Sequence, residues 1–307
     1  MRLACFVITY QRPERLREIL AAYAGQTRPP DHVLVVDNGD PGPTREAIAG
    51  CRGLSVEHRP LGDNRGPAGA AAAALARLAG DGWEWMLWAD DDDPPRFPDT
   101  LERLLRLAAA EDGPELGGVG AVGARFDWRR GRIVRVSDEE LAGGSAVAVD
   151  VVGGGHALML HRRAVAAAGL PDERLFFGLE EIEYCLRVRR CGLRLLVDGQ
   201  RMHEHRRMAG RLEHTVRRSA LPGAVRSTLW RRYYTTRNYI FLMRETFGRP
   251  DLARREAGRA VVRAAAGFLR GPRYGLAFAP LQLAAVADGY RGRMGRTVAP
   301  QPKPGRG

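Results

Sequence analysis

Residues 85–93 have the sequence WMLWADDDD, a bulky apolar run that ends in four consecutive aspartates. The run over residues 85–88 is short and apolar throughout, which predicts a buried β-strand that stops at the aspartates. Adjacent carboxylates repel one another and lose hydration unless a cation neutralises them. A bare acidic run is more often a solvated loop, but the strand before it and the prolines after it favour a functional site.

The segments before and after this strand alternate between predicted strands and helices. Strands are predicted at residues 3–9, 32–36 and 54–58, and helices at 13–24, 44–50, 70–79 and 101–110. This alternation predicts βαβ units and a mostly parallel sheet. Such sheets bind ligands beyond the carboxyl ends of their strands, where we expect Asp37, the glycine-punctuated loop 64–69 and the aspartates to lie.

The rest of the chain is less regular until a strand predicted at residues 193–197. A triple glycine at 153–155 allows close approach of the backbone to a ligand, although an ordinary loop is equally compatible. Arginine-studded helices are then predicted at 222–247, 251–270 and 275–290. We therefore expect an α/β domain over residues 1–205, a basic helical region over 206–299 and a disordered tail over 300–307.

Composition excludes several classes of protein. The chain has 307 residues, of which 45% are hydrophobic and 27% charged, so it is neither disordered nor fibrous. Its four cysteines lack metal-like or paired spacing, which fits a reducing compartment. No run of eighteen apolar residues is present, and the first apolar stretch lacks a signal-peptide cleavage pattern. We expect a cytoplasmic protein that contacts the inner face of the plasma membrane peripherally.

Positive charge is concentrated in the last third of the chain. Of the net charge of +12, the first 200 residues contribute −5 and the remaining residues +17. Such a basic region fits anionic lipid headgroups, a diphosphate-bearing substrate or nucleic acid. Nucleic acid is the least favoured because no finger, basic-heptad or RNA-recognition pattern accompanies the arginines. Equally, the arginines are compatible with the solvated face of helices that pack against the catalytic domain.

The aspartate run suggests a hard divalent cation, Mg²⁺ or Mn²⁺. Such ions take oxygen ligands and keep positions open for substrate phosphates. Alternation along an extended chain predicts that Asp90 and Asp92 share one face while Asp91 points elsewhere.

Five motifs in this order resemble those of family 2 nucleotide-sugar glycosyltransferases. They are VITYQRP (7–13), VVDN (35–38), NRGPAG (64–69), WADDD (88–92) and FFGLEEIEYCLR (176–187), and the pair His203-Glu204 follows them. Each motif alone is weak, but together they span residues 3–205. The resemblance implies the GT-A fold, a Rossmann-like α/β domain, with a nucleotide-sugar half over about 1–100 and an acceptor half over about 101–205.

The resemblance also implies roles for individual residues. The nucleotide-sugar would contact Thr9, Arg12, Asp37, Asn64, Gly66, Asp90 and Asp91. The metal ligands would be Asp90, Asp92 and His203, whereas His205, His156 and His161 have less in their favour. Glu181 matches the catalytic base, beside Glu180.

These roles imply a metal-dependent single displacement that inverts the anomeric carbon of a nucleoside-diphosphate-sugar. Two departures from the family pattern affect this expectation. Gln11 replaces an asparagine, and Glu180-Glu181 replaces an aspartate-containing pair, which moves the carboxylate by about one methylene. The acids at 180, 181 and 183 are also compatible with an acidic helix start that the helix dipole favours.

The segment RRYYTTRN (231–238) resembles one found after the catalytic domain in bacterial rhamnosyl- and galactofuranosyltransferase-like enzymes. That similarity implies synthesis of an envelope or surface polysaccharide on a glycan or polyprenyl-diphosphate-linked acceptor. Two other functions stay open. One is a nucleotidyltransferase, although residues 9–13 lack a glycine-rich, lysine-containing phosphate loop. The other is a non-catalytic membrane- or glycan-binding protein that retains the fold.

Overall fold

The computed structural model describes residues 1–144, 146–153, 157–212 and 228–299. The chain divides into two compact units. The α/β unit comprises Met1–Glu173 and Glu181–His214, and the helical unit comprises Arg174–Glu180 and Thr215–Gly307. The predicted disordered tail, His156, two residues of the triple glycine and the first residues of the helix predicted at 222–247 lie outside the described residues.

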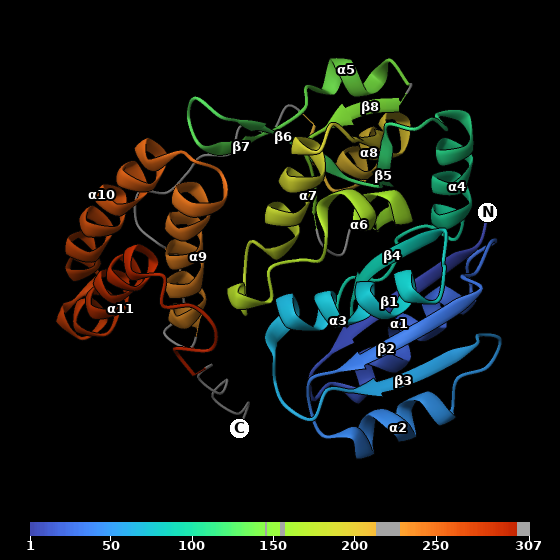
Figure 1. Ribbon diagram of the computed structural model, residues 1–307, viewed down its shortest axis with the longest axis horizontal. Coiled ribbons are helices and arrows are strands. Elements are labelled where there is room, and N and C mark those ends of the chain that lie inside the picture. The colour runs from blue at the N-terminus through green and yellow to red at the C-terminus, as the bar shows by residue number, and fades with distance from the viewer. Residues whose placement is uncertain (145, 154–156, 213–227, 300–307) are drawn as a thin grey trace. The chain divides into compact units, whose positions relative to one another are not determined.

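Four parallel strands form one half of the main sheet of the α/β unit, in the order β3-β2-β1-β4 (Figure 1). Their bounds are Leu3–Thr9 for β1, His32–Asp37 for β2, Val56–Pro60 for β3 and Trp85–Asp90 for β4. All seven residues of β1 are buried, because both neighbouring strands and the helices on the two faces cover it. The mostly parallel α/β sheet predicted from the sequence is confirmed here.

The second half of the sheet is mixed. β10 (Leu158–His161) runs antiparallel between β4 and β5 (Leu116–Gly120), β11 (Arg194–Asp198) is parallel to β5, and β8 (Ala146–Val149) is the antiparallel edge. A small second sheet contains β6 (Gly123–Asp127), β7 (Arg132–Val134) and β9 (Val151–Val152). The strand predicted at residues 193–197 is confirmed as β11, whereas β5 was not predicted because its sequence, LGGVG, contains three glycines. Those glycines permit tight packing: a Cβ on Gly118 would lie 2.9 Å from the carbonyl oxygen of Met159.

Helices cover both faces of the sheet. Their bounds are Pro13–Ala24 (α1), Pro41–Ala49 (α2), Gly66–Gly80 (α3), Thr100–Ala110 (α4), Asp138–Ala142 (α5), Arg162–Ala168 (α6), Glu180–Arg190 (α7) and Gly199–Met208 (α8). α1 buries Leu16, Ile19, Leu20 and Tyr23, which recur at helical spacing. α1 and α2 contact each other, whereas α3 contacts β1, β2 and β4. Right-handed crossovers therefore place α3 on the opposite face from α1 and α2.

The helical unit contains α9 (Leu229–Phe241), a π-helical turn (Leu242–Thr246), α10 (Pro250–Ala266), a 3-10 turn (Gly267–Arg270) and α11 (Pro272–Arg291). α9 packs against both α10 and α11, and Figure 1 shows these three helices together. Gly289 lets α11 approach α9 closely, since a Cβ there would lie 2.8 Å from the carbonyl oxygen of Arg237. The predicted C-terminal helical region is confirmed, and no helix among the described residues is long and apolar enough to cross a membrane.

Candidate functional site

The carboxyl edge of the parallel strands gathers several of the predicted site residues. In the strand register, Thr9 of β1 lies opposite Asp37 of β2, and Ile8 lies opposite Asp90 of β4. Because the three strands are parallel, all three end at the same edge. The structure thus brings together side chains that lie up to 81 residues apart in the chain.

The aspartates of the run have different surroundings. Asp91 is buried, and its two carboxylate oxygens accept hydrogen bonds from Thr9 Oγ1 at 2.9 Å and Arg12 Nη1 at 3.0 Å. Asp92 has 57% of its side chain exposed and pairs with the same Arg12 nitrogen at 3.0 Å. Both oxygens of Asp91 are therefore occupied by hydrogen bonds from the end of β1 and the loop after it, whereas the Asp92 carboxylate remains accessible to solvent.

Asp90 lies in an unfavourable place for a negative charge. Burial, followed by the charges of Glu181 and of the other aspartates in the run, raises the pKa of Asp90 to about 8. A bound cation would relieve both effects, so the donor set fits a hard divalent metal. Among the residues that the structure describes, however, no three His, Cys, Asp or Glu side chains are already grouped as a metal site. The chemical nature of these side chains thus fits a divalent metal, and the identity of the individual ligands stays a prediction.

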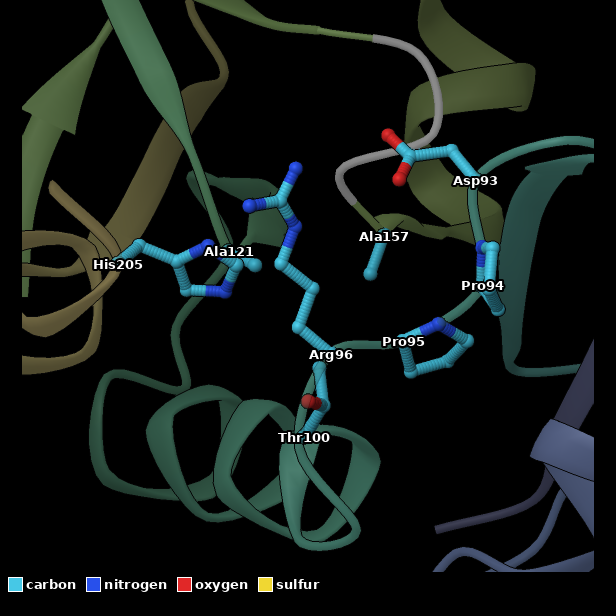
Figure 2. A pocket seen from close by; sticks show the side chains of 8 residues that line it. All are labelled: Asp93, Pro94, Pro95, Arg96, Thr100, Ala121, Ala157 and His205. Carbon is cyan, nitrogen blue, oxygen red and sulfur yellow. The ribbon is translucent and has the colours of Figure 1, made fainter. Parts of the chain in front are cut away.

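Two histidines lie on α8, and one of them lines a pocket beside the aspartate run. His205 packs edge-on against Phe97, with 5.0 Å between ring centroids, and shares the pocket with Asp93 and Ala157 (Figure 2). Residues two apart on an α-helix differ by about 200° in direction, so His203 and His205 point to different sides. His205 was given little weight from the sequence, because the resemblance to the family selects His203 of the two histidines.

An arginine fills much of this pocket. Figure 2 shows the Arg96 side chain extending between His205 on one side and Ala157 and Asp93 on the other. The remaining cavity is about 10 Å³, which is room for about one water molecule. A substrate group or ion would therefore require the exposed Arg96 side chain to move.

The neighbouring edge of the sheet is built from a network around Asp37. This carboxylate is fully buried and accepts hydrogen bonds from the Gly39 N–H at 2.8 Å and from His58 Nε2 at 3.2 Å. A ribose or base contact to Asp37 would have to share or replace one of these bonds. His58 was not singled out from the sequence, because nothing in the sequence around β3 relates it to Asp37.

The loop 64–66 is tied to the end of β2 by Asn38. Its side chain donates to the Gly66 carbonyl at 3.2 Å and accepts from the Arg65 N–H at 3.1 Å. Asn64 closes the turn by accepting from the Gly66 N–H at 2.9 Å, and Gly66 has a φ of 69°, which a glycine adopts readily. These bonds hold the loop against the strand edge, where the sequence predicted a nucleotide-binding loop.

The acid pair stands at the start of a helix. α7 begins at Glu180, which is buried, and Glu181 is half-buried and close enough to Asp90 to raise its pKa. Glu183 has a different role, because it is buried in an ion pair with Arg187, and that guanidinium also binds the carbonyl oxygens of Ala168 and Leu170. Of these three acids, Glu181 is thus the one that lies beside the aspartate run.

The chain is similar to proteins of known sequence and structure. A family model described as glycosyl transferase family 2 matches residues 4–158. Galactofuranosyltransferase GlfT1 of Mycobacterium tuberculosis (strain ATCC 25618 / H37Rv) is 32% identical over 196 residues, which are 61% of this chain and 64% of that protein. GlfT1 of Mycolicibacterium smegmatis is 34% identical over 201 residues, again 61% of this chain and 65% of that protein. The chain thus matches less than two thirds of the length of these relatives.

Solved structures show the same fold at low sequence identity. The mannosyltransferase PcManGT from Pyrobaculum calidifontis, in complex with GDP-Man and Mn²⁺, superposes with a TM-score of 0.54 at 16% identity, over 95% of this chain and 88% of that one. TarS 1-349 of S. aureus, in complex with UDP, gives a TM-score of 0.52 at 14% identity, over 95% and 92%. These likenesses establish the fold alone.

Proposed function

Because the chain belongs to glycosyl transferase family 2, we propose that it moves a galactofuranosyl residue from a nucleoside-diphosphate donor to the hydroxyl of a glycan or polyprenyl-diphosphate-linked acceptor. The observation that carries this proposal is the gathering of Thr9, Asp37 and Asp90 at one edge of the parallel sheet. The galactofuranosyltransferase names of the relatives support the sugar. Envelope or surface polysaccharide is the product class that fits these names.

The donor nucleotide would lie along the strand ends. Asp37 and the loop containing Asn64 and Gly66 would flank the base and ribose, and Thr9 and Arg12 would flank the diphosphate. Arg12 suits a diphosphate because its guanidinium already lies between Asp91 and Asp92 and is 41% exposed. The contribution of these side chains is to orient the sugar for attack.

Asp90 and Asp92 would hold a divalent cation, Mn²⁺ or Mg²⁺, together with a histidine of α8. When bound there, the cation supplies positive charge to the diphosphate as it leaves. The resemblance points to His203 as the third ligand, whereas the shared pocket with Asp93 favours His205. Asp91 would serve indirectly, since its bonds to Thr9 and Arg12 fix the path of the run.

Glu181 is the proposed catalytic base. An acceptor hydroxyl gains nucleophilicity as its proton moves to a carboxylate within hydrogen-bond reach. The hydroxyl oxygen then forms the new bond to the anomeric carbon while the bond to the diphosphate breaks on the opposite face. A single displacement of this kind inverts the anomeric configuration. Glu180 is the second candidate, and its deeper burial makes it the less accessible of the two.

The proposal is tested by transfer and hydrolysis assays with UDP-galactofuranose, UDP-galactopyranose and GDP-mannose, each with Mn²⁺, Mg²⁺ or EDTA. We expect turnover of the furanose donor with a divalent ion, loss of turnover in EDTA, and an inverted product anomer by NMR. Glu181→Gln should lower kcat by about 10²–10⁴-fold and Glu180→Gln by much less. Donor binding without turnover by the wild-type chain would instead support a non-catalytic binding protein.

A paired substitution separates the two histidines. If His205 is the metal ligand, His205→Ala should raise the Mn²⁺ concentration needed for half-maximal activity by about 10–100-fold, and His203→Ala should leave it unchanged. The reverse result would support the ligand that the resemblance implies. Equal and small effects would remove both histidines from the metal site.

We further propose a peripheral contact between the helical unit and an anionic membrane. What supports it is a set of exposed apolar side chains on α10, α11 and the turn between them: Val261, Val262, Phe268, Leu269, Leu276 and Leu283. Leu269 is 79% exposed, and exposed arginines at 254, 255, 259, 270 and 273 accompany the set. Apolar side chains next to arginines are typical of surfaces that enter the headgroup region of a bilayer.

Vesicle sedimentation tests this contact. We expect the full chain to bind vesicles that contain 30% phosphatidylglycerol and to bind phosphatidylcholine vesicles weakly. The double substitution Leu269→Ser with Leu276→Ser should weaken binding at least tenfold. The matched control is Ile133→Ser with Val134→Ser, an exposed apolar pair in β7 of the α/β unit. Equal binding by the wild type and the Leu269/Leu276 variant would contradict the proposed surface.

A further inference from the structure

Two adjacent polar side chains of α9 are completely buried. Arg237 and Asn238 each have 0% of their surface exposed. Arginine and asparagine are rarely buried to this degree unless every polar group finds a partner, because unpaired burial costs several kcal/mol. The position of their partners therefore indicates what these side chains are for.

Most of these partners are backbone carbonyl oxygens of one loop, residues 175–178. Asn238 Nδ2 donates to the carbonyl oxygens of Leu175 at 3.0 Å, Phe177 at 3.0 Å and Gly178 at 2.8 Å. Arg237 Nη2 donates to the Leu175 carbonyl at 2.9 Å, and its Nε donates to Asn238 Oδ1 at 2.9 Å. The two side chains thus form one unit that holds three carbonyl groups.

The loop needs this support because its backbone is strained. Phe176 has a φ of 61° and Leu179 a φ of 74°, both in the left-handed region that non-glycine residues rarely adopt. Such residues cost about 1–2 kcal/mol each and persist only where the surroundings fix them. Aromatic packing adds to the fixation: the Phe176 ring lies 5.2 Å from Tyr234, and the Phe177 ring lies 4.6 Å from Trp230.

The guanidinium of Arg237 is itself anchored on its other side. Nη1 donates to the Gly295 carbonyl at 2.7 Å and to Thr297 Oγ1 at 2.9 Å, and the Tyr234 ring lies 4.7 Å away. The chain after α11 therefore contributes to the same support. Because all these contacts lie within the helical unit, the loop 174–180 is part of that unit although it precedes α9 by about fifty residues.

We propose that Arg237 and Asn238 are positioning residues for glycosyl transfer, which fix the loop that starts α7 and thereby the acid pair Glu180-Glu181. The proposal rests on the proposed function of Glu181 as the base. Chain continuity makes the connection, since Leu179 is followed directly by Glu180, the first residue of α7. A displacement of about 1 Å in a reacting group is enough to lower a rate about 10²-fold.

Hydrogen–deuterium exchange tests the support without any assay of activity. Asn238→Ala removes the three donated bonds, so exchange at the amides of residues 175–182 should become at least tenfold faster. Arg237→Lys is a milder variant that keeps the charge and loses the planar fork, and it should show the same effect more weakly. The control is Thr236→Val on the same helix, because the buried Thr236 hydroxyl bonds Gln282 and no loop carbonyl. Unchanged exchange in Asn238→Ala would overturn the proposal.

Kinetics then separate positioning from general stability. Asn238→Ala should lower kcat by about 10–100-fold, whereas the affinity for the donor nucleotide should stay within twofold, since its binding residues lie on the sheet edge. In a Glu181→Gln background the same substitution should have little further effect, because the group it positions is gone. An equal loss of kcat in both backgrounds would show that Asn238 does not act through Glu181.

The outcomes for the two proposals are distinct. If Glu181→Gln retains full activity, the assignment of the base fails whatever Asn238 does. If Glu181→Gln is inactive and Asn238→Ala has normal kcat, the base stands and the positioning role is wrong.

Discussion

Replacing Asp90 by asparagine should stabilise the metal-free protein while it abolishes activity. Asp90 is half-buried at the end of β4 with Glu181 and three further aspartates around it, and these surroundings raise its pKa from 3.8 to about 8. Because the pKa of Asp90 is higher in the folded protein than in the unfolded chain, the free energy of unfolding decreases as the pH rises from 3.8 towards 8. Asparagine has the same shape and no charge, so it avoids this cost.

The magnitude follows from the pKa. At pH 7 the aspartate is ionised in the unfolded chain, whereas the folded protein must either protonate it or accept the repulsion. This difference costs about 1.4 kcal/mol per pKa unit, so Asp90 lowers the free energy of unfolding by at most about 4 kcal/mol. The neighbouring carboxylates share this penalty, and part of it remains with them after the substitution. We therefore expect Asp90→Asn to raise the free energy of unfolding by roughly 1–3 kcal/mol at pH 7 in EDTA.

The assay is urea unfolding in EDTA at pH 7 and again at pH 4.5, where the difference between variant and wild type should shrink. The matched control is Asp92→Asn, because that side chain is 57% exposed and its pairing with the half-exposed Arg12 should contribute no more than about 1 kcal/mol. With saturating Mn²⁺ the order should reverse, since only the wild type gains stability from the ion. If Asp90→Asn is the less stable protein in EDTA at pH 7, the carboxylate makes favourable contacts there and the reasoning is wrong.

Three further predictions concern stability. The Nδ1 atom of His161 accepts a hydrogen bond from the Arg163 N–H at 3.1 Å, and burial together with the charge of Arg163 lowers the pKa of His161 below 6.5. The neutral imidazole therefore contributes fully to the free energy of unfolding above pH 6.5, and this contribution is lost as the pH drops through the folded-state pKa. His161→Asn should make the free energy of unfolding in urea less dependent on pH between about pH 7 and 5. Gly120→Ala should cost about 1–3 kcal/mol in the same assay, because its Cβ would lie 2.4 Å from Val152 Cγ1, and an unaltered midpoint would contradict this packing. Tyr234→Phe removes the hydroxyl that accepts from the Val298 N–H at 3.0 Å and should cost about 1–3 kcal/mol, with faster amide exchange at 297–298 as the local check.

The first half of the fold was predictable from the sequence because each element there carries a strong local signal. The apolar runs of β1, β2 and β4 and the amphipathic spacing of α1 gave bounds within two residues of those observed. β10 was not predictable as an antiparallel strand between β4 and β5, because strand direction depends on contacts far apart in the chain. β5 has Val119 as its one β-branched residue among three glycines, so it carries little of the composition that marks a strand.

The same distinction applies to the candidate site. Aspartates at the end of an apolar strand can be recognised from the sequence alone, and so can a glycine-punctuated turn before a helix. His58 acts through one side-chain hydrogen bond and Asn38 through two, all to residues on neighbouring segments, and no spacing in the sequence signals such bonds. The resemblance to the family predicted the acid pair Glu180-Glu181, but it did not indicate that side chains of α9 bind the loop that precedes this pair.

With the proposed site residues, donor binding and proton transfer would depend on different parts of this chain. The residues proposed to bind the nucleotide belong to β1, β2 and the loop before α3, where hydrogen bonds within the α/β unit fix them. The segment that leads into Glu180 is fixed by Arg237 and Asn238 of the helical unit. Substitutions at Thr9 or Asn38 should consequently act on the KM for the donor, and substitutions at Asn238 on kcat. If variants at the sheet edge and variants at Asn238 each changed KM and kcat together, donor binding and proton transfer would depend on the same structural elements.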